Sequence, residues 1–292
     1  MKSLKDTIFN KIKINVSHFY PFLIRTLRFP IYYFKEFLRY QINQRIEIPN
    51  GPVVKKLRNG LYCAIDFMFD RRVHRIYREL YEPHIVRAIK KYLKKGETFI
   101  DVGASIGYLT IIGAGCVGKK GNVHSFEPVP IYFSLLKKSA KLNRDYRIFP
   151  NESAIGNSSG TASIKITTFP LFNTMVKELV EEEILKEILE VKVQRLDDYI
   201  YKNRIDRISL IKIDIEGNEY TALQGLTKYF EKETDLPVII CEIVPLSADV
   251  LINLEKLMAN YNYRAFDILT EKPIDIKKIN RTTDVLFKNT PR

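Results

Sequence analysis

The sequence predicts an α/β fold in which a mostly parallel, doubly wound sheet carries helices on both faces. Short apolar stretches alternate with amphipathic stretches from residue 98 to residue 261. The apolar stretches are nearly continuous, which is typical of parallel strands covered on both sides. Two final β-like stretches, 263–269 and 282–288, have no long helix between them, so we expect an antiparallel edge there.

Each expected element carries a local signal. Residues 51–67 predict a hairpin, because Asn59-Gly60 is a strong turn signal, and residues 71–97 show helical periodicity that ends at Gly96. Further strands are expected at 98–102, 122–128, 146–155, 208–217 and 236–243, and helices from about Gly107 and at 130–144, 218–230 and 247–261. We also expect an antiparallel hairpin at 156–166 and an acidic amphipathic surface helix at 176–190.

The N-terminal segment is basic and aromatic. Residues 1–45 hold nine Lys and Arg against two acidic residues, a net +7 of the total +13. Pro21 and Pro30 predict several short helices there. We expect a helical extension over 1–50 that packs on a domain formed by 51–292, and we keep open an amphipathic contact of residues 1–45 with an anionic membrane.

Targeting and redox signals predict a cytoplasmic protein, peripheral to a membrane if the N-terminal segment binds lipid. The uncharged stretch 14–24 is too short to span a bilayer and lacks a signal-peptide layout. Cys63, Cys116 and Cys241 are widely spaced and odd in number, which predicts buried free thiols. The four histidines show no metal-ligand spacing, so no required metal is expected.

A glycine turn follows the strand at 98–102, in the stretch Asp101-Val-Gly-Ala-Ser-Ile-Gly107. Ligands of doubly wound sheets bind at the carboxyl ends of the strands. Gly103 permits a turn with positive φ, and Gly107 opens a helix whose N-terminal N–H groups are available to a ligand. The spacing is not the Gly-x-Gly-x-x-Gly of dinucleotide sites. Asp101 places a negative charge there, which favours a cationic or amine-bearing ligand.

Two further strand ends carry acidic residues. Glu127 ends the strand at 122–128, where a carboxylate can accept hydrogen bonds from a ribose 2′,3′-diol. Nicotinamide enzymes use an acidic residue at the same place, so Glu127 alone leaves the cofactor open. In the stretch 208–217, alternation puts Lys212, Asp214 and Glu216 on one side. A lysine in a buried strand needs a partner, which predicts a pair with these carboxylates near the cleft.

With these residues, the chain resembles the FkbM family of S-adenosylmethionine-dependent methyltransferases. The similarity covers most of residues 81–242. It runs, in the family's order, through YEPHI, FIDVGASIGYLT, HSFEPVP, NESAIGNSSG, VQRLDDYI and LIKIDIEGNEYTALQGL. The resemblance implies a Rossmann-like class I methyltransferase fold, a mostly parallel seven-stranded sheet with an antiparallel last strand, and S-adenosylmethionine as the cofactor.

The resemblance also implies roles for individual residues. The implied cofactor-binding set is Asp101, Gly103, Ala104, Ser105, Gly107, Glu127, Pro128, Asn151, Glu152 and Ala154. Within it the glycine turn would hold the methionine part, Glu127 the ribose, and Asn151, Glu152 and Ala154 would border the adenine. Asp214, Glu216 and Gly217 would lie on the substrate side. The chain departs from the family at Ser105, where the family usually has Asn.

We therefore expect an O-methyltransferase that acts on a hydroxyl of a glycan or related small molecule. A hydroxyl needs a base, and Asp214 and Glu216 are the candidates, ahead of Glu82, His84 and Glu219. Three alternatives stay open: a nicotinamide-dependent oxidoreductase, a nucleic-acid methyltransferase suggested by the net charge, and a non-enzymatic module anchored through residues 1–45. No Asn/Asp-Pro-Pro-Tyr stretch follows the fourth strand, so no nucleic-acid partner is expected.

Overall fold

The computed structural model describes residues 49, 51–68, 73–167 and 185–290, so the predicted helical extension lies outside the described residues. The chain divides into two compact units, residues 1–49 with 74–81, and residues 50–73 with 82–292. The described part of the first unit is Pro49 and residues 74–81. These residues include most of helix α3 (Val73–Tyr77). Just past the helix, the Leu80 amide donates a hydrogen bond back to the Arg75 carbonyl. The predicted boundary at residues 50 and 51 stays a prediction.

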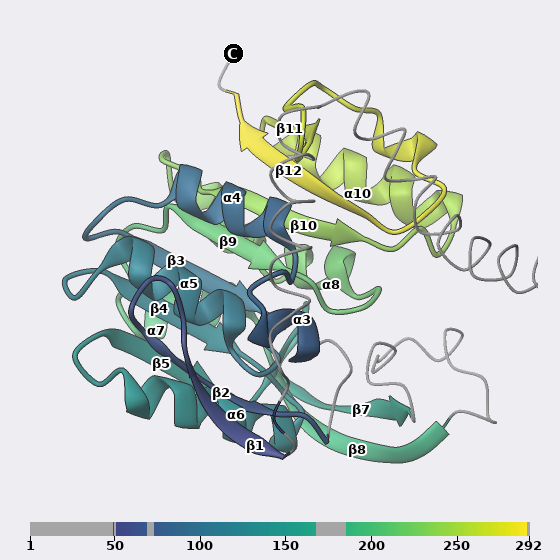
Figure 1. The fold of residues 1–292 in the computed structure, drawn as a ribbon. Coiled ribbons are helices and arrows are strands. Elements are labelled where there is room, and N and C mark those ends of the chain that lie inside the picture. The colour runs from purple at the N-terminus through teal and green to yellow at the C-terminus, as the bar shows by residue number, and fades with distance from the viewer. Residues whose placement is uncertain (1–48, 50, 69–72, 168–184, 291–292) are drawn as a thin grey trace, which may run out of the picture. The chain divides into compact units, whose positions relative to one another are not determined.

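A seven-stranded sheet forms the centre of the second unit, as predicted (Figure 1). In spatial order its strands are β11 (Tyr263–Asp267), β12 (Thr283–Asn289), β10 (Val238–Ile243), β9 (Leu210–Ile213), β3 (Thr98–Val102), β4 (Asn122–Phe126) and β5 (Arg147–Asn151). Strands β10, β9, β3, β4 and β5 are parallel, and β12 is antiparallel to both of its neighbours. The chain runs outward from β3 to β5 and then returns to β9, so strand order reverses between β3 and β9. Ligands bind at this point in doubly wound sheets.

Helices cover both faces of the sheet (Figure 1). Helices α4 (Pro83–Tyr92), α5 (Tyr108–Val117) and α6 (Pro130–Leu142) lie on one face, where the ring of Phe99 in β3 packs directly under Gly113 of α5. The other face is covered by α7 (Leu196–Lys202), α8 (Glu219–Gln224), α9 (Thr227–Lys232) and α10 (Ala248–Asn260). The apolar side chains of Ile211 and Ile213 in β9 are buried on this face. This confirms the prediction that the side chains of Ile211 and Ile213 point to one face of β9 and that of Lys212 to the other.

A hairpin and a small sheet complete the unit. Strands β1 (Pro52–Lys56) and β2 (Tyr62–Asp66) pair antiparallel, as predicted. Strands β6 (Ala154–Ile155), β8 (Leu185–Gln194) and β7 (Gly160–Thr167) form a separate three-stranded sheet. The expected single strand at 146–155 is thus wrong, because its last residues pair with β8 instead of continuing β5.

Two predictions on this small sheet are also wrong. The hairpin expected within 156–166 does not form, because β7 pairs with β8 from a distant part of the chain. The helix expected at 176–190 is a strand over 185–190, while residues 176–184 lie outside the described residues. Leu189, Val191 and Val193 all pack on the same small core, which is the two-residue period of a strand.

The expected long helices are broken at two places. The described residues of 71–97, which are 73–97, form α3 and α4 separately: Pro83 starts α4, and Glu82 before it has a left-handed φ of 41°. Residues 218–230 form α8 and α9, which meet at Gly225, where an added Cβ would lie 2.2 Å from the Gly156 carbonyl oxygen. A short 3-10 helix, Ile276–Lys278, precedes β12. Within the described residues, no helix has both the length and the apolar character needed to cross a membrane.

Candidate active site

The glycine turn lies at the carboxyl end of β3 and is fastened to the end of β4. The amides of Gly103 and Ala104 both donate to the Phe126 carbonyl, at 3.0 and 2.9 Å. Gly103, Ser105 and Gly107 have φ angles of 76°, 50° and 88°, so the chain passes through the left-handed region three times within five residues. Gly107 is the N-cap of α5, as expected. The turn thus brings the N-terminus of α5 to the strand ends, where unpaired N–H groups favour polar ligand atoms.

Gly103 also sets the distance between β3 and β9. A Cβ added there would lie 1.8 Å from the backbone oxygen of Asp214 and 3.0 Å from the Ile215 side chain. No side chain fits into this space, so the backbone beyond β9 lies directly against the turn. Asp214, which we expect on the substrate side, and the expected cofactor turn are therefore neighbours.

Asp101 is buried below the turn. Its side chain has no exposed surface, its Oδ2 accepts a hydrogen bond from Thr110 Oγ1 at 2.6 Å, and Lys212 Nζ lies 3.7 Å from its Oδ1. Burial raises the pKa of Asp101, and the nearby Lys212 ammonium opposes that rise. The carboxylate joins β3, α5 and β9, so it orders the turn from below. A direct contact between Asp101 and a ligand stays a prediction.

Glu127 holds the glycine turn through a hydrogen bond from the Ser105 amide. Its Oε2 accepts from the Ser105 amide at 2.8 Å and its Oε1 from the Val129 amide at 2.9 Å, and the residue is 5% exposed. The role of Glu127 in holding a ribose stays a prediction. Pro128 follows, half-buried, and its cofactor contact stays a prediction.

The residues expected to border adenine are spread over two sheets. Asn151 ends β5, and its Nδ2 donates to the Phe149 carbonyl at 2.9 Å and to Tyr199 Oη at 3.1 Å. Glu152 is exposed, whereas Ala154 is 6% exposed and packs in the core of the small sheet. Asn151 therefore lies at the same sheet edge as Glu127. The binding roles of all three residues stay predictions.

Lys212 connects the turn to Asp214. Its side chain is 4% exposed, and its Nζ lies 3.0 Å from the Gly103 carbonyl and 3.2 Å from Asp214 Oδ2. Burial alone would lower the pKa of Lys212, but the carboxylates of Asp214 and Asp101 outweigh burial and raise it above its ordinary value. The ammonium is therefore charged at neutral pH, and the expected lysine–carboxylate pair is present.

Beside Asp214 lies a group of carboxylates that the sequence pattern did not reveal as a group. Carboxylate oxygens of Asp214, Glu216 and Glu242 lie within 4.8 Å of one another, so their charges interact strongly. Glu242 of β10 faces Asp284 of β12 across the antiparallel pair, and Asp284 Oδ2 lies 2.7 Å from His84 Nε2. Glu242 had a signal in the sequence, because it ends an apolar strand as Glu127 does. Asp284 had none, because it begins its strand.

The less favoured base candidates have structural contacts. Glu219 is 3% exposed, and its Oε1 accepts from the Gly217 and Ile215 amides at 2.9 and 3.2 Å, so it fastens the loop after β9. Burial raises the pKa of Glu219 to about 7. Glu82 precedes α4, and His84 pairs with Asp284.

Comparison with known proteins now identifies the fold family. The model of the methyltransferase FkbM domain matches residues 101–265, which is more than half of the chain. The chain belongs to the FkbM methyltransferase family. It is therefore an S-adenosylmethionine-dependent methyltransferase with a class I fold, as the sequence predicts.

Two curated relatives show how far the FkbM similarity extends. The chain is 24% identical over 208 residues to "31-O-demethyl-FK506 methyltransferase FkbM" of Streptomyces tacrolimicus, covering 63% of this chain and 75% of that protein. It is 23% identical over 146 residues to "Hexuronic acid methyltransferase AglP" of Haloferax volcanii, covering 50% of this chain and 56% of that protein.

Solved structures are more distant. A putative rRNA-methylase from Clostridium thermocellum gives a TM-score of 0.45 at 15% identity, covering 72% of this chain and 95% of that chain. Aeropyrum pernix fibrillarin in complex with S-adenosyl-L-methionine gives 0.41 at 12% identity, covering 83% of this chain and 96% of that chain.

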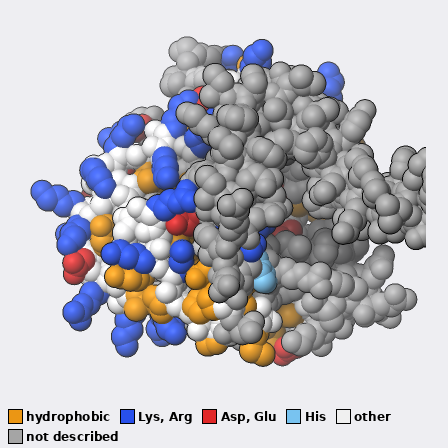
Figure 2. Space-filling view, viewed as in Figure 1, with side chains coloured by type: hydrophobic (Ala, Val, Ile, Leu, Met, Phe, Trp, Pro, Cys, Tyr) orange, Lys and Arg blue, Asp and Glu red, His pale blue; other side chains and the backbone are white. Residues whose placement is uncertain are grey.

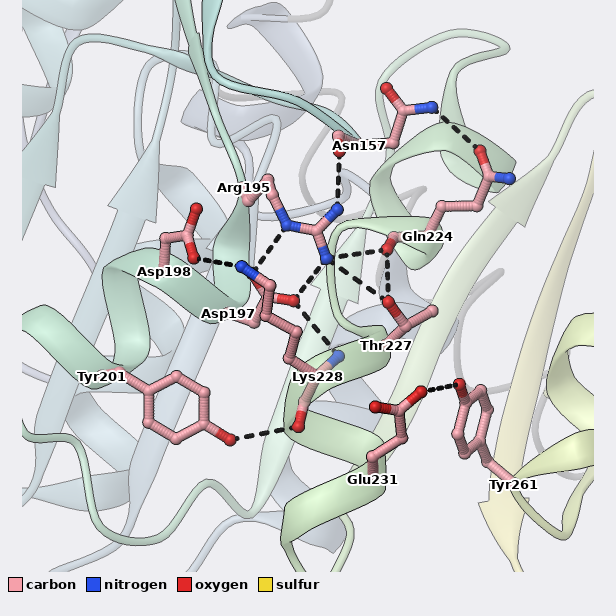
Figure 3. A network of polar contacts seen from close by, with 10 residues as sticks. All are labelled: Asn157, Arg195, Asp197, Asp198, Tyr201, Gln224, Thr227, Lys228, Glu231 and Tyr261. Atoms are coloured by element: carbon pink, nitrogen blue, oxygen red, sulfur yellow. Dashed lines mark hydrogen bonds and ion pairs between the residues drawn. The ribbon is translucent and has the colours of Figure 1, made fainter.

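The FkbM-like motif VQRLDDYI has a structural role in this chain (Figure 3). Arg195 donates to both carboxylate oxygens of Asp197, at 2.9 and 2.5 Å, and Asp197 is fully buried. Arg195 also donates to the backbone carbonyls of Asn157 and Gln224, and Asp197 accepts from the Lys228 amide. This bidentate pair ties the turn after β6 to α7, α8 and α9, on the face opposite the glycine turn.

Proposed function

We propose that the protein transfers a methyl group from S-adenosylmethionine to a hydroxyl of a glycan or related small molecule. The observation that carries the proposal is the position of Asp214. Its backbone lies against Gly103 of the cofactor turn, and its carboxylate lies at the exposed end of β9, paired with Lys212. A carboxylate beside the methyl donor can accept the proton that a hydroxyl loses.

The residues of the chain fit the cofactor. Gly103, Ser105 and Gly107 shape the turn, Glu127 offers acceptor oxygens for the ribose, and the N-terminus of α5 faces the same edge. Bound S-adenosylmethionine supplies an electrophilic methyl group on a positively charged sulfur. Holding the acceptor hydroxyl in line with that methyl group accounts for about 7–11 kcal/mol of the barrier in well-oriented reactions.

Asp214 and Glu216 are our candidates for the catalytic base. The side chain of Asp214 is 21% exposed, so an acceptor can reach it from solvent. Glu216 has a left-handed φ of 55° in the loop that follows β9, and a carboxylate oxygen of Glu216 lies near those of Asp214 and Glu242. The backbone strain at Glu216 supports a functional role for this loop.

The substrate class comes from the relatives. One is named for 31-O-demethyl-FK506 and another for a hexuronic acid. Both names are of small molecules with hydroxyl groups, which favours a hydroxyl acceptor here. The test is transfer of a labelled methyl group to a panel of sugars and polyols by the wild type and by Asp214→Asn. We expect product with the wild type only, with S-adenosylhomocysteine affinity unchanged in the variant.

The charge pattern gives less support to a nucleic-acid acceptor. Figure 2 shows Lys and Arg side chains spread around the described part of this face, with hydrophobic side chains between them. Over half of the net charge lies in residues 1–45, outside the described residues. A steep fall in activity with added salt on an RNA or DNA acceptor would favour nucleic acid instead.

We further propose a cytoplasmic protein, and we keep a contact of its basic residues 1–45 with anionic lipid as the alternative to the expected extension packed on the domain. The support is the sequence: nine cations against two acidic residues, interleaved with aromatic side chains. Flotation with vesicles of anionic and of neutral lipid, using the full chain and a chain lacking residues 1–45, tests this. Equal flotation of both chains would remove the membrane contact from the account.

A further inference from the structure

Three carboxylates lie side by side across neighbouring strands at the substrate edge. Cys241 pairs with Ile213 in the parallel β10–β9 ladder, so Glu242 lies level with Asp214. Glu242 also pairs directly with Asp284 in the antiparallel β10–β12 ladder. Partners in register project from the same face of a sheet, so Asp214, Glu242 and Asp284 form one row, which we call the carboxylate row.

Two nitrogen-bearing side chains, Lys212 and His84, contact the row at its two ends. Lys212 Nζ is 3.2 Å from Asp214 Oδ2, and His84 Nε2 is 2.7 Å from Asp284 Oδ2. Glu242 lies between them, and its Oε2 is buried without a hydrogen-bond partner among the described residues. The titratable and charged groups around Glu242 are Lys212, Asp214 and Glu216 from β9 and its loop, Asp284 from β12, His84 and Glu82 from α4 and its N-cap, and Glu219 from α8.

Ionised carboxylates this close repel each other, and the Lys212 ammonium lies against Asp214. When like charges are this close, one of the two groups keeps its proton. The Lys212 ammonium favours the charged form at Asp214, so the proton belongs on Glu242. A protonated carboxyl group donates a hydrogen bond, and an ionised neighbour accepts it.

We propose that Glu242 is a positioning residue, kept as a neutral carboxylic acid that donates its proton to Asp214, so that the pair holds one proton and one negative charge. Burial, followed by the negative charges of Asp214, Glu216 and Asp284, raises the pKa of Glu242 to about 10. The role of Asp214 as base rests on the proposed function; the shared proton does not.

The pair has consequences for the reaction. Glu242 holds one carboxylate oxygen of Asp214 in place. The other oxygen then has a fixed orientation toward the acceptor. When the acceptor O–H bond breaks, its proton forms a new O–H bond on Asp214, and the pair then holds two protons and no charge. The single negative charge of the pair suits a neutral hydroxyl at this edge.

The direct test measures the free energy of unfolding of the whole chain as a function of pH, because its slope reports how many protons the folded and unfolded states bind. Glu242 in the folded state has a raised pKa, so between pH 7 and 9.5 the folded chain holds a proton that the unfolded chain has lost. Stability therefore falls as pH rises through this window. Glu242→Gln cannot lose that proton, so we expect its stability to fall less steeply, by a slope equal to about one proton.

Glu271→Gln is the matched control. Contacts with Lys288 and Lys91 outweigh burial and lower the pKa of Glu271 to about 2, so this group is ionised in both states above pH 7. Its replacement should reduce stability without changing the slope between pH 7 and 9.5. A wild-type slope in Glu242→Gln would overturn the proposal.

A second variant and a cation titration test the protonated state of Glu242 independently. Asp214→Asn removes the negative neighbour, so proton release from Glu242 should move to lower pH even if Glu242→Gln fails to fold. If added Mg²⁺ raises the melting temperature of the wild type but not of Glu242→Gln, the carboxylates are ionised and bind a cation, and the proposal is wrong.

Activity then separates this proposal from the proposed function. We expect Glu242→Gln, which keeps a donor beside Asp214, to retain kcat within tenfold, and Glu242→Leu to lose more, both with unchanged KM for S-adenosylmethionine. A kcat that is equal in both variants would show that the donor does not position Asp214. Should the proton count hold while no hydroxyl acceptor is methylated, the proposed function fails and the neutral Glu242 stands.

Discussion

Gly103→Ala tests whether the contact between the glycine turn and the backbone of Asp214 builds the active site. The substitution has two costs. A residue with a Cβ at a φ of 76° costs about 1–2 kcal/mol. The Cβ would also lie 1.8 Å from the Asp214 carbonyl oxygen, so the ends of β3 and β9 must move apart by well over 1 Å. Overpacking of this kind costs about 1–3 kcal/mol more.

Gly96→Ala provides the matched control. Gly96 has a φ of 87°, and nothing lies within 4 Å of an added Cβ. It carries the conformational cost alone, about 1–2 kcal/mol. The difference between the two variants in urea unfolding therefore measures the clash, and we expect Gly103→Ala to be the less stable by about 1–3 kcal/mol.

The activity of the two variants decides whether the contact matters for function. A displacement of about 1 Å at a reacting centre can reduce the rate on the order of 100-fold. We expect Gly103→Ala to lose S-adenosylhomocysteine affinity and methyl transfer, and Gly96→Ala to keep both. Equal stability and equal activity of the two variants would refute the reasoning, because the turn would then tolerate a side chain against Asp214.

Three further predictions concern the residues around the site. Asp197→Ala leaves the Arg195 guanidinium, 17% exposed, without its buried partner, so urea unfolding should show a loss of about 3–5 kcal/mol, and a loss below 1 kcal/mol would contradict this. Ser105→Asn should raise stability by about 0.6–1 kcal/mol, because Asn is several-fold enriched at left-handed φ; calorimetric melting measures it, and a lower melting temperature refutes it. Glu219 has a raised pKa of about 7, so its protonated form favours the folded state and its contribution falls as pH rises from about 4.5 to 7. Glu219→Gln should reduce that fall, and an unchanged pH profile would show that Glu219 is already ionised.

Much of the central sheet could be predicted from the sequence, because its strands carry strong local signals. The strand at 98–102 has the predicted bounds, and the alternation of Ile211 and Ile213 against Lys212 reports the two faces of β9 correctly. These signals exist because strands buried on both faces of a parallel sheet are apolar over several consecutive residues. Such a pattern is visible in a short stretch of sequence.

The errors arise where pairing, and not the local pattern, decides the structure. Residues 185–190 read as a helix, but pairing with β7 makes them a strand. Residues 146–155 read as one strand, but two sheets divide them. Local sequence contains neither partner, so propensity is overridden by tertiary context.

The same limit applies to the candidate site. The glycine turn, Glu127, Lys212 and Asp214 were predicted because they sit at strand ends with visible patterns. The carboxylate row was not, since Asp284 reaches Glu242 through an antiparallel register and reaches His84 across 200 residues of sequence. Only the folded sheet shows that these groups lie together at one edge.

The most direct test of the central claim is calorimetric titration of the wild type and of Glu127→Ala with S-adenosylhomocysteine, with NADH as the competing ligand. We expect the wild type to bind S-adenosylhomocysteine with a Kd of about 1 μM, near −8 kcal/mol, and to give no heat with NADH. Glu127→Ala should bind at least tenfold more weakly, because it loses the ribose acceptor and the bond to the Ser105 amide. Unchanged affinity in Glu127→Ala, or binding of NADH instead, would contradict the assignment of this strand edge as the cofactor site.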